Sequence, residues 1–225
     1  MQPYLFPYPG YFQLIHAVDA FVVYDDVNYI NRGWINRNNI LERGQARRFT
    51  LEVSGASQNR RINEIGVGGN RPRLLKQLQH AYAKAPQFGD VFPLLETVLL
   101  HDEPNLARFL ANGLQRVCDY LELQPAWYMS SAITIDDGLR GEDRILALCE
   151  SLGATHYINL PGGRDLYAAE HFGRKGIRLS FIEPEPVEYA QFGDAFVPNL
   201  SVIDLMMFND RQRCREILAG YRLDG

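Results

Sequence analysis

The sequence predicts a mixed α/β protein with a mostly parallel sheet covered by helices, and three observations support this class. Short runs rich in β-branched and aromatic residues alternate with helical patterns near both ends of the chain. From residue 72 to 123, apolar residues recur only three and four positions apart. The 225 residues, 46% of them hydrophobic, can bury one full core. We therefore expect a single domain over residues 1–225, with α/β halves at 1–71 and 124–225 and a helical insertion at 72–123.

The first element is an extended aromatic segment followed by a helix and a strand. Prolines at positions 3, 7 and 9 fix φ, so residues 1–10 should form an extended loop rather than a helix. The periodicity then predicts a helix over 11–18 and a buried strand over 20–24. The polar and aromatic stretch after it favours an ordered loop over 27–40.

The next segments begin with a half-buried strand and continue into the helical stretch. Residues 47–53 alternate in hydrophobicity, and the glycine-rich residues 54–71 should form an exposed excursion. Helices are expected at 73–85, 91–100 and 105–123, with Asn105 as a cap of the last. Beyond Pro125, strands are expected at 127–133, 155–160 and 177–183, and helices at 142–153 and 165–176.

Composition and charge exclude several classes of protein. The net charge of −4 is spread along the chain and provides no field for a phosphate backbone, so nucleic acid is not expected as the main ligand. No apolar run approaches the roughly 20 residues of a membrane span, and the start lacks signal-peptide features. We therefore expect a cytoplasmic protein without membrane insertion. Three distant cysteines indicate buried thiols in a reducing compartment. The sequence indicates no oligomeric state.

Two adjacent carboxylates, Asp25 and Asp26, follow the first predicted strand. Ligands of α/β sheets bind at the carboxyl ends of strands, where this pair could bind a cation, act as a base or hold an amine. Because side chains alternate along a strand, at most one of the two is expected to face the site. The alternative interpretation is that one caps the next turn and the other is solvated.

A second strand end carries Asn159, Gly162 and Gly163, followed by Tyr167. Glycines between a strand and a helix let backbone N–H groups converge on an anion. A plain left-handed turn explains the two glycines equally well, since no complete phosphate-binding motif is present.

The loop after the acidic pair combines Arg32, Trp34, Asn36 and Arg37. Arginine forks match phosphates and an indole covers a ring, so this mixture suits a nucleotide-linked sugar. The alternative is that Trp34 anchors the loop in the core while the arginines are solvated.

Among the five histidines only His80 is a candidate, because it lies with Tyr82 on a predicted helix that could reach a cleft. A packed histidine is the commoner outcome at such a position. No two histidines pair at i, i+4, so no metal site is predicted. No cysteine lies at a strand-to-helix turn and no G-x-S-x-G motif exists, which gives covalent acyl-enzyme chemistry little support.

Several blocks together resemble the WbqC-like family. They are QPYLFPYPGYFQLI, DAFVVYDDVNYINRGWINRN, HAYAKAPQF, LGATHYIN with Gly163 and LY, and VEYAQFGDAFVPNLSVIDLMMFN, and they cover nearly the whole chain. Two departures are visible. Family members usually carry a few apolar residues before the first block as a first strand, and they end the last block in Asn-Gly where this chain has Asn209-Asp210.

The resemblance implies an accessory enzyme of bacterial surface-polysaccharide (O-antigen) biosynthesis. It suggests acyl or aminoacyl transfer, such as glycyl transfer, from an activated acyl donor to the amine of a nucleotide-linked amino sugar. No other cofactor is expected. The candidate catalytic residues are Asp25, Asp26 and His80. The candidate substrate-binding residues are Gln2, Tyr4, Tyr8, Tyr11, Tyr29, Arg32, Trp34, Asn36, Arg37, Asn159, Gly162, Gly163 and Tyr167.

Two other functions fit the same residues. One is a noncatalytic ligand-binding or scaffold protein of glycan assembly, and the other is a metal-dependent hydrolase built on the acidic pair and a histidine. The acid at position 204 lies within an apolar run, so Asp204 should be paired if it is buried. We expect its partner in the N-terminal loop.

Overall fold

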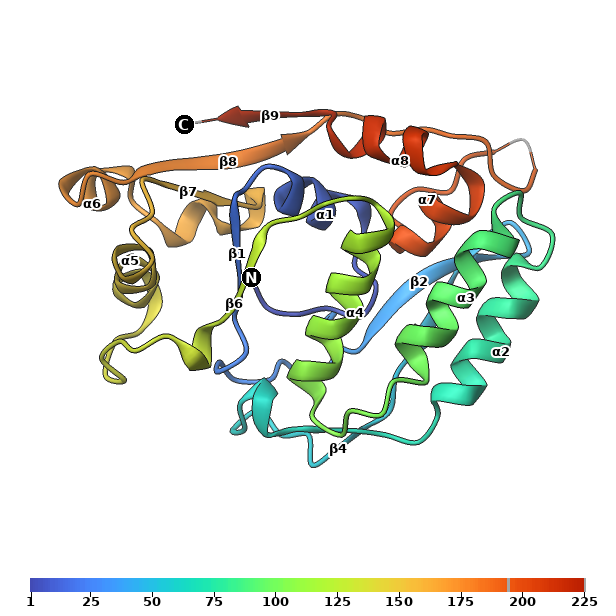
Figure 1. Ribbon diagram of the computed structural model, residues 1–225, viewed down its shortest axis with the longest axis horizontal. Helices are drawn as coiled ribbons and strands as arrows, with labels where there is room; N and C mark the ends of the chain where they lie inside the picture. The colour runs from blue at the N-terminus through green and yellow to red at the C-terminus, as the bar shows by residue number, and fades with distance from the viewer. Residues whose placement is uncertain (194, 225) are drawn as a thin grey trace.

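Two parallel strand pairs form the α/β part of the computed structural model, which describes residues 1–193 and 195–224 (Figure 1). Strand β1 (Ala20–Val23) pairs with β6 (Ala126–Met129), and β7 (His156–Asn159) pairs with β8 (Arg178–Pro184). The antiparallel strand β9 (Tyr221–Asp224) lies on the other edge of β8. The mixed α/β class predicted from the sequence is therefore confirmed. The predicted mostly parallel sheet is wrong, because the described strands form four separate sheets and only these two pairs are parallel.

An antiparallel hairpin forms from β2 (Arg37–Glu42) and β3 (Gln45–Thr50). Both residues of its two-residue loop have positive φ, 52° at Arg43 and 74° at Gly44, as the tight primed turns of hairpins require. The short strands β4 (Val53–Ser54) and β5 (Gly66–Val67) make a second antiparallel pair.

The hairpin corrects the expectation of a loop over 27–40, because β2 begins inside that range. The polar residues that suggested a loop are Asn38 and Asn39, and Asn38 is in fact buried. Its Nδ2 atom donates to the carbonyl oxygen of Phe6 at 2.7 Å, so the amide is satisfied inside the fold. Polar residues at buried strand positions therefore hid this strand from a reading based on hydrophobicity.

The helices up to residue 174 lie close to their predicted positions, although the first begins at Pro9, inside the predicted loop over 1–10, and the two beyond residue 200 had no predicted bounds. They are α1 (Pro9–His16), α2 (Arg71–Tyr82), α3 (Phe88–Leu99), α4 (Leu106–Tyr120), α5 (Gly141–Ser151), α6 (Ala169–Arg174), α7 (Val202–Phe208) and α8 (Arg211–Leu218). Short 3₁₀ helices are η1 (Ile62–Glu64), η2 (Ser130–Ala132) and η3 (Pro161–Leu166). Asn105 caps α4 as predicted, since its side chain accepts a hydrogen bond from the amide of Arg108. In the described residues no helix is long and apolar enough to cross a membrane.

Apolar side chains gather in two clusters. The larger one lies around α1, α2, α3, α4 and α7, and α2, α3 and α4 lie side by side in Figure 1. The smaller one joins α5 to β7, β8 and α6, and includes Ile145, Phe172 and Phe181. A cavity of about 360 Å³ lies where β1, β7, α1 and α5 meet.

All three cysteines are buried free thiols, as the sequence suggests. Burial raises the pKa of Cys149 to about 11 and that of Cys214 to about 12, with smaller contributions from Glu150 and Asp210 respectively. These thiols therefore stay protonated near neutral pH.

The carboxylate of Asp204 is fully buried, but its partners are not in the N-terminal loop. It accepts hydrogen bonds from Tyr82 Oη at 2.8 Å, Tyr189 Oη at 2.9 Å and Gln191 Nε2 at 2.5 Å. The expected partner was wrong because the loop is held instead by Ser201, whose Oγ donates to the carbonyl oxygen of Phe6.

Stability should depend on the ionisation of Asp204. Burial raises the pKa of Asp204, and hydrogen bonds from Tyr82, Gln191 and Tyr189 oppose the rise only in part. A carboxyl whose pKa is higher in the folded state binds its proton more tightly there, so this contribution to stability is lost as pH rises from about 4. We expect the free energy of unfolding of Asp204→Asn to fall less over that range than that of the wild type. Urea unfolding between pH 4 and 7 measures this, with exposed Asp102→Asn as the control. Parallel pH profiles for wild type and Asp204→Asn would contradict the assignment.

Candidate functional site

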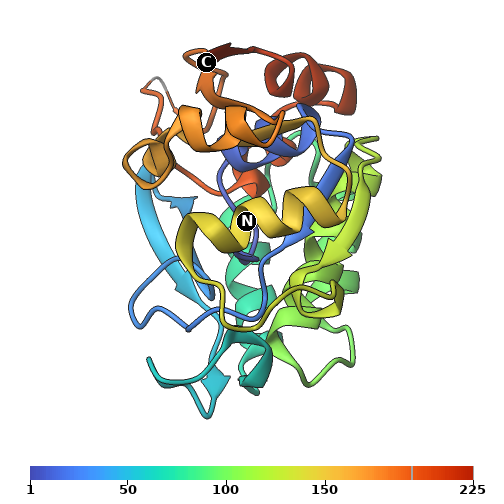
Figure 2. The same cartoon turned by 90° about the vertical axis from the view of Figure 1, so that its left-hand side faces the viewer.

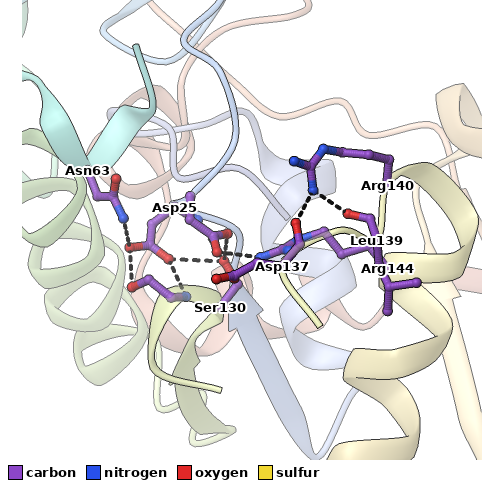
Figure 3. Close-up of polar contacts among 9 residues, drawn as sticks. Asp25, Asn63, Ser130, Asp137, Leu139, Arg140 and Arg144 are labelled. Atoms are coloured by element: carbon purple, nitrogen blue, oxygen red, sulfur yellow. Dashed lines mark hydrogen bonds and ion pairs between the residues drawn. The ribbon is translucent and has the colours of Figure 1, made fainter. Parts of the chain in front are cut away.

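A network of carboxylates and hydroxyls forms where β1 and β6 end, and Asp25 lies at its centre (Figure 3). The Asp25 side chain is almost completely buried. Its carboxylate accepts hydrogen bonds from Ser130 Oγ at 3.0 Å, from the amide and Oγ of Ser131 at 3.0 and 2.7 Å, and from Asn63 Nδ2 at 3.1 Å. Four donors therefore hold one carboxylate in a fixed orientation.

Asp26 lies beside it and forms an ion pair with Arg144 of α5. Only 7% of the Asp26 side chain and 8% of the Arg144 side chain are exposed. The same guanidinium lies over the ring of Tyr24, 5.9 Å from its centroid. Burial raises the pKa of Tyr24 and the Arg144 charge lowers it in part, so the phenol remains neutral at physiological pH.

Both carboxylates meet at Ser130, which corrects two expectations. Ser130 Oγ lies 3.0 Å from Asp25 Oδ1 and 2.5 Å from Asp26 Oδ1, and neither acid is solvated. The alternation rule did not apply because β1 ends at Val23, before the pair. Ser130 also accepts the amide hydrogen of Asp25 and has one hydroxyl hydrogen to give, so it can donate to only one of the two carboxylates at a time.

Arg140 adds a positive charge at the rim of this network (Figure 3). Its guanidinium is exposed and donates to the carbonyl oxygens of Asp137 and Leu139, the latter at 2.7 Å. In the described part of the chain it makes no ion pair within 4.0 Å. A guanidinium has five donors, so Arg140 can still bind an anion.

The second strand end predicted from the sequence shares an apolar cluster with the first, since Tyr24, Tyr157 and Tyr167 all pack against it. Gly162 and Gly163 belong to η3 and neither has a positive φ, so the left-handed turn suggested as an alternative is absent at both. A Cβ on Gly163 would lie 2.7 Å from Asn159 Nδ2, which explains the glycine by close packing. Asn159 itself is buried and donates to Tyr157 Oη at 3.1 Å.

Aromatic residues of the N-terminal segment divide between the core and the surface. Tyr11 is fully buried and donates its hydroxyl to the carbonyl oxygen of Gln2 at 2.7 Å. The rings of Tyr4 and Tyr11 are 5.6 Å apart, whereas Tyr8 is 40% exposed. Gln2 is partly buried. Tyr11 thus fixes the backbone of this segment, and Tyr8 is accessible to a ligand.

The loop between β1 and β2 is arranged differently from the expectation. Asn36 is buried, where it accepts the hydroxyl of buried Tyr29 at 2.9 Å and donates to the carbonyl oxygen of Leu51. Trp34 is 47% exposed, which corrects the alternative that it anchors the loop in the core. Arg32 is exposed, and Arg37 Nε donates to the carbonyl oxygen of Gly33.

His80 is exposed on α2, and in the described residues no hydrogen bond joins it to either acid. Within residues 1–193 and 195–224, no group of three or more His, Cys, Asp or Glu side chains could hold a metal ion.

Sequence reasoning missed the residues that complete the network, namely Asn63, Ser130, Ser131 and Arg144, and also the exposed Arg140. The serines directly follow the strand that pairs with β1, so the register of that pair would have placed them beside Asp25. No local pattern marks Asn63 or Arg144. They come from segments 38 and 118 residues away along the chain.

The network offers one accessible hydroxyl backed by a buried carboxylate. Ser131 is exposed, while the Asp25 oxygen that accepts its hydroxyl hydrogen, Oδ2, also accepts a hydrogen bond from Asn63, and Ser130 and the Ser131 amide lie at Oδ1. Such an arrangement can accept a proton from a bound group through the serine and retain it on the carboxylate.

Comparison with known proteins gives one family and one relative. Residues 2–216 match the sequence model of the WbqC-like protein family. An uncharacterized protein of Mycobacterium tuberculosis (strain ATCC 25618 / H37Rv), Rv1507c, is 28% identical over 205 residues, which cover 89% of this chain and 88% of that protein. No solved structure matches the chain significantly.

Breaking the buried ion pair should cost more than breaking an exposed one. Arg144→Met leaves Asp26 buried without its cation, and Asp26→Asn leaves the cation unpaired, so we expect each to lower the free energy of unfolding by about 3 kcal/mol. The double variant should lose less than the sum of the two. Urea unfolding of the wild type, the two single variants and the double variant measures the coupling energy between Asp26 and Arg144. The exposed Lys175–Glu150 pair is the matched control, with an expected coupling of about 0.5 kcal/mol. Additive losses for Asp26 and Arg144 would contradict the pairing.

Proposed function

Because the chain belongs to the WbqC-like protein family, we propose that it is an accessory enzyme of bacterial surface-polysaccharide (O-antigen) synthesis that acylates an amino sugar. The proposed substrate is a nucleotide-linked amino sugar in the cytoplasm, and the proposed donor is an activated acyl or aminoacyl thioester. The observation that carries the proposal is the exposed Ser131 hydroxyl bound at 2.7 Å to the buried carboxylate of Asp25.

Amide formation needs a group that removes a proton from the attacking amine. In the proposed step the amine nitrogen bonds to the acyl carbon and the carbon–sulfur bond breaks, releasing the thiolate. The amine proton passes to Ser131 Oγ as the serine's own hydrogen moves to Asp25 Oδ2. Asp25 suits this role because Asn63 and Ser130 prevent it from turning away.

The residues around Asp25 have supporting roles in the proposal. The ion pair with Arg144 holds Asp26 in place, and Asp26 in turn holds the Ser130 side chain by a hydrogen bond. This keeps both serines within hydrogen-bonding distance of the carboxylates. Arg140 is placed to bind a phosphate of the nucleotide, since its guanidinium is exposed at the rim of the network. Tyr24 supplies a neutral phenol beside Arg144, because burial raises the pKa of Tyr24.

The remaining candidates stay predictions for this site. In the described residues no side-chain contact joins His80 or the loop tyrosines Tyr4 and Tyr8 to Asp25. A scaffold protein that binds the same nucleotide-linked sugar without reaction is the second candidate. It is favoured by the hydrogen bonds that Asp25 accepts inside the fold, because Ser130, Ser131 and Asn63 already occupy its carboxylate oxygens.

Replacing Ser131 should separate catalysis from folding. Ser131→Ala removes the proton path but only one hydrogen bond from an exposed residue, so we expect about 100-fold lower kcat with near wild-type stability. Formation of the N-acylated sugar from nucleotide-linked amino sugars and acyl thioesters is the measurement, followed by mass spectrometry. Ser151→Ala, at the exposed end of α5, is the matched control.

The wild type and Ser131→Ala also distinguish substrate binding from catalysis. A nucleotide-linked amino sugar should raise the melting temperature of wild type and of Ser131→Ala alike, because a ligand that binds the folded state stabilises it. Stabilisation without product in either protein would favour the scaffold function. Full activity of Ser131→Ala would contradict the proposed proton path.

A further inference from the structure

One exposed surface combines apolar and cationic side chains outside the network at Asp25. It consists of Ile30, Arg32, Trp34, Arg37 and Arg48, and we call it the Trp34 surface. Ile30 is 52% and Trp34 47% exposed, the largest apolar exposures between β1 and β3 in the described chain. The loop that carries both residues lies at the side of the molecule next to the β2–β3 hairpin (Figure 2).

The side chains of this surface are arranged around the indole. The guanidinium carbons of Arg48 and Arg37 lie 5.5 and 6.0 Å from the centroid of the Trp34 ring, within cation–π distance. Arg32 has a φ of 61° in the turn closed by the Gly33 amide and the Ile30 carbonyl oxygen. The backbone thus holds a cation, an indole and an aliphatic side chain together on one exposed turn.

The charge of this region is opposite to that of the rest of the chain. Residues 27–61 contain seven arginines and two glutamates, a net +5, although the whole chain carries −4. In the part of the chain that the structure describes, no carboxylate lies within 4.0 Å of the guanidinium of Arg32, Arg37 or Arg48. These three cations are therefore available to an external anion.

We propose that the Trp34 surface docks the protein onto an anionic membrane surface, without crossing it. Tryptophan is favoured at the lipid–water boundary, where its ring meets the acyl chains and its N–H stays hydrated. Arginine stems can lie along the same boundary while their guanidinium groups bind lipid phosphates. The excess negative charge elsewhere on the chain turns this basic region toward the membrane.

A membrane fits this surface better than a nucleic acid does. Single-stranded nucleic acids stack successive bases on several aromatic side chains, whereas this surface presents a single indole with two guanidinium groups beside it. Ile30, the more exposed of the two apolar members, has no partner on a sugar–phosphate backbone, whereas an acyl chain can cover it. The proposal is independent of the reaction proposed at Asp25.

Vesicle sedimentation tests the docking directly. We expect the protein to sediment with vesicles that contain 30% phosphatidylglycerol, to remain in the supernatant with pure phosphatidylcholine, and to lose binding as salt is raised. Arg37→Gln/Arg48→Gln should weaken binding roughly 25-fold, since each arginine near an anionic surface contributes about a fivefold factor. The control is Arg73→Gln/Arg116→Gln, which removes two exposed arginines elsewhere on the fold and should leave binding within about twofold.

Tryptophan fluorescence measures the contact of Trp34 with lipid separately from sedimentation. The emission of Trp34, taken as the difference between wild type and Trp34→Ala, should shift to shorter wavelength with anionic vesicles. Absence of sedimentation with the anionic vesicles, or equal losses in both double variants, would overturn the proposal. Equal affinity for a single-stranded oligonucleotide at the same salt concentration would overturn it as well.

Discussion

The hydrogen bonds to the Asp25 carboxylate join three segments that lie far apart along the chain. They connect the end of β1 to η1 through Asn63 and to η2 through the two serines. Asn63 in turn accepts, through its carbonyl oxygen, a hydrogen bond from the side chain of Asn105, which caps α4. The strand ends, the 3₁₀ turns and the start of the longest helix thus share one buried anion. The burial of a charge is tolerated here because each donor compensates its lost hydration.

The sequence was most informative where a single period governs an element. The helices over 71–120, the cap at Asn105 and the strands β1, β7 and β8 appear within a few residues of their predicted positions. The prediction from sequence failed at β2, where the polar residue Asn38 occupies a buried strand position. Asn38 is tolerated there because it donates a hydrogen bond to the carbonyl oxygen of Phe6, 32 residues away along the chain. Local patterns cannot reveal a partner that only the fold supplies.

The residues of the candidate site were likewise predictable only where the local sequence marks them. Adjacent acids after a strand are visible in the sequence, and both are in the network. Their partners are ordinary residue types, a pair of serines, an asparagine and an arginine, and only the pairing of β1 with β6 and the packing of α5 bring them together. Asp204 shows the converse, because its burial was predictable from the apolar run but its tyrosine and glutamine partners were not.

The distance along the chain between the two halves of the network also governs when it can form. Asp25 and Ser131 are 106 residues apart, and β1 has no parallel partner until β6 is made. At synthesis rates of about 5–20 residues per second, roughly 5–20 s separate the emergence of the two halves from the ribosome. During that interval the acidic pair and the open edge of β1 remain exposed on the nascent chain, and closure of so long a loop is an intrinsically slow step. Any factor that covers this edge during translation would therefore favour the correct pairing of β1 with β6 over pairing with another chain.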